Sequence, residues 1–304
     1  MYKILSFDGG GVYGVLSLCV LDKILEKRPN LIDSVNLLTG TSIGSLIAIS
    51  IAAGRTPSEL IGLFPALSKS IFSCEPTRLI KSYLGLCAKY DNANFESILE
   101  KYFGQVKLGE LKKKILVPSF NLCKKNKDRR ANWKAKFFHN LGGNDCDGNE
   151  LAKDVVLRST AAPLFFPSYQ GYVDGFFVGN NPSLCAVVQT QDPRNEEPNP
   201  KITDVSVISI GTREFFSICE QRNDWGFVKW AAPFVNIMLT KDEGIANYQC
   251  DKLLGKRYKR IEVTVPDELH VGMDDYKSVP KFIEFGKSIN LDENIFLWLD
   301  QNWH

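Results

Sequence analysis

A serine between two glycines is the first feature that could do chemistry, in the run Gly40-Thr41-Ser42-Ile43-Gly44. The run fits the pattern G-x-S-x-G. An apolar run at 35–39 precedes it and another at 43–53 follows, so we expect a strand before Ser42 and a helix after it. In that setting the glycines allow a sharp turn that lifts the hydroxyl above a sheet, at the positive end of the helix. A plain helix start made of small residues is the alternative, but the flanking elements favour a nucleophilic Ser42.

A glycine cluster follows the first apolar run, in Asp8-Gly9-Gly10-Gly11. Consecutive glycines can expose several backbone N–H groups to one point, as an oxyanion hole requires. Gly9, Gly11 and Gly14 also satisfy the dinucleotide-binding pattern G-x-G-x-x-G, which would indicate a nucleotide-dependent oxidoreductase. That pattern needs an acidic residue at the end of the second strand. The expected second strand ends in Thr39-Gly40, so the oxyanion hole is favoured.

The base that would activate Ser42 is less obvious from the residues alone. The order Ser42, Asp174, His270 imitates the nucleophile, acid and histidine order of α/β-hydrolases. That fold, however, places its nucleophile after several strands, and His270 stands in a polar segment, so we do not expect a catalytic histidine. Asp174 follows a short expected strand and precedes a glycine, which on its own also fits a simple turn.

A basic stretch with one tryptophan could contact a membrane. An exposed hairpin tip of this composition could dock on anionic lipid, and a solvated loop is the alternative. No nucleic-acid recognition fold accompanies it, so we expect no nucleic-acid partner. The residues of this stretch that we assign to possible membrane contact are Lys124, Lys125, Lys127, Arg129, Arg130 and Trp133.

Composition narrows the class of protein. The 304 residues are 44% hydrophobic and 24% charged with a net charge of +2, which is typical of a globular protein and excludes nucleic-acid binding through the overall field. The eight cysteines include no CxxC pair, and the run at 144–150 lacks the first aspartate of a calcium loop, so we expect no metal site. Without a leader or an apolar membrane span, we expect a soluble cytoplasmic chain, peripheral at membranes, with delivery into another cell left open.

The elements that must position these residues form an alternating pattern of strands and helices, which indicates a parallel α/β sheet. The polar run at 189–200 is the best candidate for a boundary, but strands are expected on both sides of it. We therefore expect one domain over 1–304. The expected strands are 3–7, 35–39, 115–122, 204–210 and 258–265, and the expected helices are 15–24, 43–53, 57–67, 151–158, 227–254 with a kink at Pro233, and 279–288.

Three motifs in order resemble the patatin-like lipid acyl hydrolases. They are Asp8-Gly9-Gly10-Gly11, Gly40-Thr41-Ser42-Ile43-Gly44, and Asp174-Gly175 followed by Asn180-Asn181-Pro182. Similar stretches occur at 159–163, 208–212, 225–230 and 273–275, so the resemblance extends from about residue 3 to 288.

The resemblance implies a three-layer α/β/α domain with a mostly parallel central sheet. It also implies a serine–aspartate dyad in which Ser42 is the nucleophile and Asp174 its base, without a metal or cofactor. Gly9, Gly10 and Gly11 would form the oxyanion hole, and Asp8 would order their loop. A carboxylate shielded from water can accept the serine proton without a histidine. The implied substrate is a membrane or micellar glycerolipid, phospholipid or lysophospholipid first; the oligomeric state is not implied.

Two positions depart from the family pattern. Tyr13 stands where the family usually has arginine or lysine, and Phe176 stands where it usually has glycine or alanine. Both substitutions leave the dyad intact but place the preference for a phospholipid over a neutral or lysolipid ester in question. A catalytically weak lipid-binding protein of the same fold is therefore the alternative function, ahead of the oxidoreductase.

Overall fold

The centre of the structure is a sheet whose middle strands are buried on both faces. The computed structural model describes residues 1–122, 133–213, 224, 226, 229–230 and 244–303, and within them seven strands pair in one sheet. Such strands are expected where helices cover both sides of a parallel sheet. The strands are β1 Tyr2–Phe7, β2 Leu37–Gly40, β3 Lys114–Asn121, β4 Lys134–His139, β5 Tyr172–Val173, β6 Val205–Arg213 and β7 Tyr258–Thr264.

The strand order brings three loops to one edge of the sheet. The order is β4-β3-β2-β1-β6-β7, with β5 beside β3; β4 and β5 run antiparallel to β3, and the other pairings are parallel. Phe7 at the end of β1 pairs with Gly40 of β2 and with Ile210 of β6. The segments that begin at Asp8, Thr41 and Gly211 therefore start level with one another, at the carboxyl edge where α/β folds place their sites.

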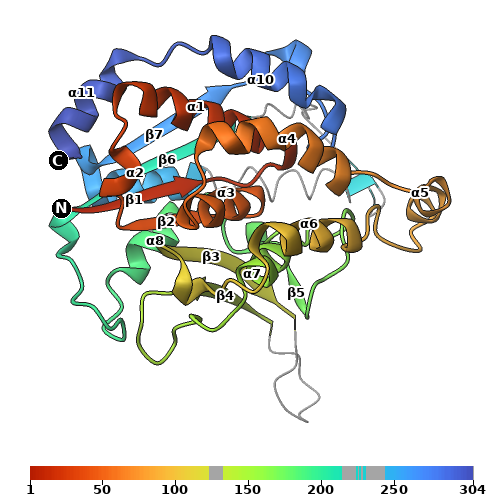
Figure 1. Cartoon of the computed structure of the whole chain (residues 1–304), viewed down its shortest axis with the longest axis horizontal. Coiled ribbons are helices and arrows are strands. Elements are labelled where there is room, and N and C mark those ends of the chain that lie inside the picture. The colour runs from red at the N-terminus through yellow and green to blue at the C-terminus, as the bar shows by residue number, and fades with distance from the viewer. Residues whose placement is uncertain (123–132, 214–223, 225, 227–228, 231–243, 304) are drawn as a thin grey trace.

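Helices cover both faces of this sheet (Figure 1). Leu5 and Leu38 belong to the larger core, which α1, α3, α4 and α10 complete, whereas Ile4 and Leu37 point to the opposite face and pack with α8. The described helices are α1 Gly14–Lys27, α2 Leu31–Ser34, α3 Ile43–Ala52, α4 Pro57–Ile71, α5 Pro76–Tyr83, α6 Ala93–Phe103, α7 Ala152–Ser159, α8 Ser183–Gln189, α10 Val279–Ser288 and α11 Glu293–Asn302.

These layers confirm the predicted fold class, an α/β/α arrangement around a mostly parallel sheet. The ends of each expected strand lie within three residues of those of an observed one. α4 begins at the predicted capping box, with Thr56 accepting from the Glu59 N–H. Of the expected helix 227–254, residues 244–254 are helical; most of the rest, including Pro233, lies outside the described residues. α2, α5, α6, α8 and α11 were not expected.

The domain prediction for 1–304 stays a proposal. The polar loop at 189–200 leads from α8 into β6, which pairs with β1 in the same sheet. Across the stretches that the structure describes, every helix is too short or too polar to cross a bilayer.

Candidate active site

Ser42 lies on a strained turn between β2 and α3. Its φ is 53° and its ψ is −125°, a conformation that costs a non-glycine residue about 1–3 kcal/mol. A Cβ atom on Gly40 would overlap the carbonyl of Gly44, and one on Gly44 would overlap the carbonyl of Phe7. The two glycines are therefore required by close backbone packing, and this is the local geometry of a nucleophile elbow.

The structure brings Ser42 and Asp174 together. The Ser42 Oγ donates a hydrogen bond of 2.8 Å to Oδ2 of Asp174, and the Phe176 N–H donates one of 2.9 Å to Oδ1. Asp174 follows β5 and is fully buried. Burial raises the pKa of Asp174 to about 7, while the hydrogen bonds from Phe176 and Ser42 act in the opposite direction. A carboxyl group with this pKa suits proton transfer near neutral pH.

Residues 159–161 hold both members of this pair. Ser159 Oγ accepts a hydrogen bond from the Ser42 N–H and donates one of 2.8 Å to the Pro118 carbonyl on β3. The Asp174 N–H donates to the Ala161 carbonyl at 3.1 Å. The motif at 159–163 was recognised in the sequence only as part of the resemblance; its contacts indicate that Ser159 fixes the elbow relative to β3.

The glycine loop lies beside Ser42, with one of its amides already bonded. Gly10 and Gly11 line the same pocket as Ser42. The Gly9 N–H, however, donates to the Asn180 carbonyl at 3.2 Å, so it does not supply the oxyanion contact predicted for it. Within the described residues no backbone acceptor binds the Gly10 or Gly11 amide. Of the three glycines predicted as oxyanion donors, Gly10 and Gly11 are therefore the two whose amides carry no such bond.

Two distant segments hold this loop in place. On one side, Gly9 packs against Asn180, and the Thr41 hydroxyl donates to the Gly179 carbonyl at 2.7 Å, so 179–180 joins the glycine loop to the elbow. On the other side, the Val12 N–H donates to the Met273 carbonyl at 2.8 Å. Sequence patterns near Asn180 and Met273 matched the family but gave no role for either residue.

Asp8 is fixed by an ion pair behind the loop. Its carboxylate lies 2.7 Å from the guanidinium of Arg260 on β7, and the two side chains are only 1% and 12% exposed. A Cβ atom on Gly211 would overlap this pair, so the glycine at the end of β6 makes room for it. Burial raises the pKa of Asp8, and Arg260 opposes that shift. The pair anchors the first residue of the glycine loop to the sheet.

An apolar pocket opens at the Ser42 hydroxyl. It is partly open to solvent, and its walls beside the polar groups are mainly aliphatic and aromatic. Such walls suit a hydrocarbon chain. The apolar lining comes from Ile43, Ile71, Phe72, Phe95, Ala162, Phe165, Phe166, Phe176 and Met273.

Both departures from the family pattern have structural roles. Tyr13 is buried, and its hydroxyl donates to the Val271 carbonyl at 2.7 Å and accepts from the Val271 N–H at 2.9 Å. The tyrosine thus ties the 271–273 segment over the glycine loop. Phe176 is buried, stacks on Phe177 with ring centroids 4.3 Å apart and lines the pocket beside the dyad.

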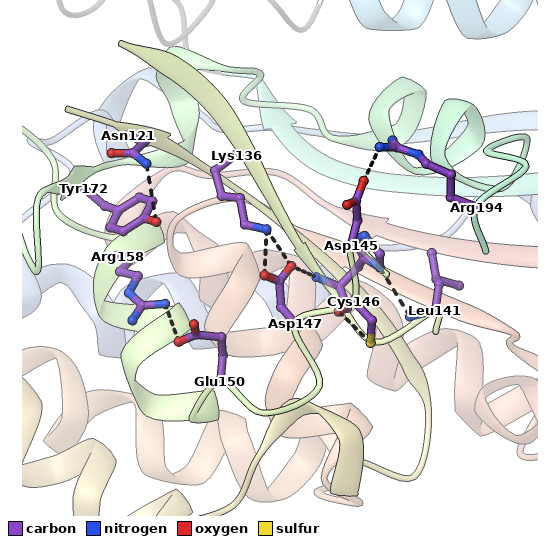
Figure 2. A network of polar contacts seen from close by, with 11 residues as sticks. Asn121, Lys136, Leu141, Asp145, Cys146, Asp147, Glu150, Arg158, Tyr172 and Arg194 are labelled. Atoms are coloured by element: carbon purple, nitrogen blue, oxygen red, sulfur yellow. Dashed lines mark hydrogen bonds and ion pairs between the residues drawn. The ribbon is translucent and has the colours of Figure 1, made fainter. Parts of the chain in front are cut away.

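Two predicted features remain, the basic stretch at 124–133 and the run at 144–150. Lys124 to Arg130 lie outside the described residues, whereas Trp133 is exposed. The run at 144–150 is a turn, in which Asp147 forms an ion pair with Lys136 and accepts from the His139 N–H (Figure 2). In the described part of the chain no group of three residues could hold a metal ion.

Comparison with known proteins fits this geometry. The family model "Patatin-like phospholipase" matches residues 5–186. Protein teg of Priestia megaterium is 30% identical, with 100% of this chain and 99% of the relative covered. A cGAMP-activated phospholipase of Pseudomonas aeruginosa is 28% identical over 88% of this chain and 80% of its own. The crystal structure of VipD from Legionella pneumophila has a TM-score of 0.43 at 12% identity, covering 99% of this chain and 67% of VipD. The chain belongs to the patatin-like phospholipase family.

Proposed function

We propose that this chain hydrolyses fatty acyl esters of glycerolipids, phospholipid or lysophospholipid first, through an acyl-enzyme on Ser42. Family membership supports lipid acyl hydrolysis in general. The observation that carries the finer proposal is the 2.8 Å hydrogen bond from Ser42 to the buried Asp174 at the mouth of an apolar pocket. The cellular location and the contact of 124–133 with membranes stay predictions.

The first half of the reaction forms the acyl-enzyme. Ser42 Oγ attacks the ester carbonyl carbon while its proton passes to Asp174. The amides of Gly10 and Gly11 donate to the oxyanion, and the N-terminus of α3 favours the developing negative charge. When the tetrahedral intermediate collapses, the ester C–O bond breaks and the leaving alcohol takes the proton from Asp174.

The second half releases the fatty acid. A water molecule attacks the acyl carbonyl and gives its proton to Asp174, and the same two amides bind the second oxyanion. Collapse of this intermediate breaks the bond to Ser42 Oγ, which recovers the proton. The pocket holds the acyl chain throughout, so the walls close to Ser42 decide which chains fit.

The pH dependence of ester hydrolysis follows from the pKa of the base, Asp174. Because Asp174 must be ionised to accept the proton, and burial raises its pKa to about 7, kcat/KM should rise with pH and reach half its plateau near pH 7. The measurement is hydrolysis of a soluble short-chain ester between about pH 5 and about pH 9. A rate that stays level from about pH 5 upwards would contradict a raised pKa at the base.

The substrate is tested with lipids directly. Incubation with a mixed lipid extract, followed by mass spectrometry, should release fatty acids and the matching lysolipids or glycerol derivatives. A fluorophosphonate probe should add once to the peptide that contains Ser42. Ser58→Ala, which changes an exposed serine of α4, is the matched control and should keep both signals, whereas Ser42→Ala should lose both.

The lipid-binding alternative makes a different prediction in the same experiment. A protein that binds lipid without catalysis would retain fatty-acyl lipids but yield no products and no probe adduct. That combination would overturn the hydrolase proposal while leaving the family membership unchanged.

A further inference from the structure

The short helix α5 presents apolar side chains to solvent. In α5 and the turn after it, Ile80 is 61% exposed, Tyr83 82%, Leu84 69% and Leu86 71%. No residue of α5 is buried. Ile80, Tyr83 and Leu84 are spaced at i, i+3 and i+4, so they lie on one face of the helix. We name Ile80, Tyr83, Leu84 and Leu86 the apolar edge. Figure 1 places α5 at one end of the molecule, away from the sheet.

The apolar edge is held in its exposed position by bonds to the body. Arg78 donates to the Tyr90 carbonyl at 2.7 Å, and the Cys74 thiol donates to the Lys89 carbonyl at 2.9 Å. After the helix, the Leu86 N–H donates to the Lys81 carbonyl at 2.9 Å. The segment therefore has a defined conformation, in which its own chain does not cover these side chains.

The apolar edge is continuous with the wall of the pocket. The segment begins just after Ile71 and Phe72, which line the pocket, and it returns at Tyr90, whose N–H donates to the Phe165 carbonyl at 2.7 Å. Phe165 is another lining residue, and Leu164 before it is 58% exposed. The segment that carries the apolar edge is thus joined to the pocket wall at both of its ends.

The charges around the apolar edge are mainly positive. Between residues 69 and 89 the cations are Lys69, Arg78, Lys81 and Lys89, and the single acidic residue is Glu75. Lys89 forms an ion pair with Asp274, whereas Lys69 and Lys81 are exposed. Exposed apolar side chains flanked by lysine and arginine are the features of segments that lie at a membrane surface.

We propose that the apolar edge docks on an anionic glycerolipid bilayer and brings the pocket mouth against it. Ile80, Tyr83, Leu84 and Leu86 enter the region between head groups and acyl chains, and Lys81 contacts the anionic head groups. The role of docking in substrate entry rests on the proposed function, but docking itself does not. This surface is separate from the basic stretch at 124–133.

The test measures vesicle binding and hydrolysis separately. The full chain carrying Ser42→Ala is sedimented with vesicles of phosphatidylcholine alone or mixed with phosphatidylglycerol. Serine at all four positions of the apolar edge should lower the partition coefficient at least about tenfold. Lys81→Glu should weaken binding to the mixed vesicles only, because its contact is electrostatic.

A matched control changes an equal number of exposed apolar residues elsewhere. Serine at these positions should leave vesicle binding within about twofold of the parent, because none of them belongs to the apolar edge or lines the pocket. Both fourfold serine variants should have a melting temperature close to that of the parent, since the changed side chains are exposed and do not belong to the core. The control positions are Val188, Tyr248, Leu253 and Leu297.

The outcomes separate docking from catalysis. With Ser42 restored, the apolar-edge variant should hydrolyse a soluble short-chain ester at the parent rate but lose hydrolysis of vesicle lipid in step with binding. Unchanged vesicle binding would overturn the docking proposal, as would a dimer in the parent that the variant loses, because a second copy would then occupy the edge. If the protein binds vesicles through the apolar edge but cleaves neither the soluble ester nor the vesicle lipid, the proposed function is overturned and the docking proposal stands.

Discussion

Ser42→Ala should lower kcat/KM for any ester substrate by about 10⁴-fold or more, because it removes the hydroxyl that is hydrogen-bonded to Asp174 at the pocket. Asp174→Asn should lower it by about 10²–10⁴-fold, the range of a lost general base. The asparagine is close in shape to the aspartate, so the loss reports on the charge of the base. Initial rates on a soluble ester and on phospholipid vesicles provide the measurement.

The stability of Asp174→Asn distinguishes a lost base from a lost fold. The pKa of Asp174 is raised to about 7 in the folded chain, so the folded state binds this proton more tightly than the unfolded state does. The contribution of Asp174 to the free energy of unfolding therefore becomes less favourable as pH rises from about 4 to about 7, and then levels off. At higher pH the variant should be at least as stable as the parent. If Asp174→Asn is both inactive and unfolded, its inactivity does not support a role for Asp174 as the base. If the variant keeps full activity, that role is refuted.

Arg260→Met should lower the free energy of unfolding by about 3–5 kcal/mol, because it leaves the buried Asp8 carboxylate without its partner. Urea unfolding at neutral pH provides the measurement. Lys259→Met, one residue earlier on β7, is the matched control and should change stability by no more than about 0.5 kcal/mol. Changing both partners together, in Asp8→Asn with Arg260→Met, should recover much of the loss, since no unpaired charge is then buried.

The same variants test what the ion pair does for the glycine loop. If Asp8 anchors that loop to β7, the double variant should refold but hydrolyse esters more slowly than the parent. Equal losses of stability for Arg260→Met and Lys259→Met would show that the pair does not matter to the fold.

The sequence predicted those parts of the site that depend on local backbone chemistry. Gly40 and Gly44 stand where a side chain would overlap a carbonyl, so the elbow could be recognised from five residues and the apolar runs around them. Asp174 is different: β5 is two residues long, and only the resemblance identified the aspartate as the partner of Ser42. The hydrogen bond between them joins positions 132 residues apart.

The parts that the sequence did not predict depend on distant segments meeting. Ser159 accepts a hydrogen bond from the Ser42 N–H across 117 positions. The Asn180 carbonyl accepts one from the Gly9 N–H, although the glycine run by itself suggested that this amide was available. The pocket draws its aromatic walls from α6 and from the ends of separate segments, so no single stretch contained its pattern. α5 was not predicted because its eight residues span only about two helical turns, fewer than a periodic pattern needs to be recognised.

The contacts of Met273 and Val271 make the glycine loop depend on a segment that is remote in the chain. The carbonyl that binds the Val12 amide and the backbone groups that bind Tyr13 come more than 250 positions after the loop that they hold. A fragment without these positions would keep Ser42 and Asp174 but lose these contacts to the glycine loop. The conformation of that loop is therefore a property of the assembled fold rather than of the glycine run alone.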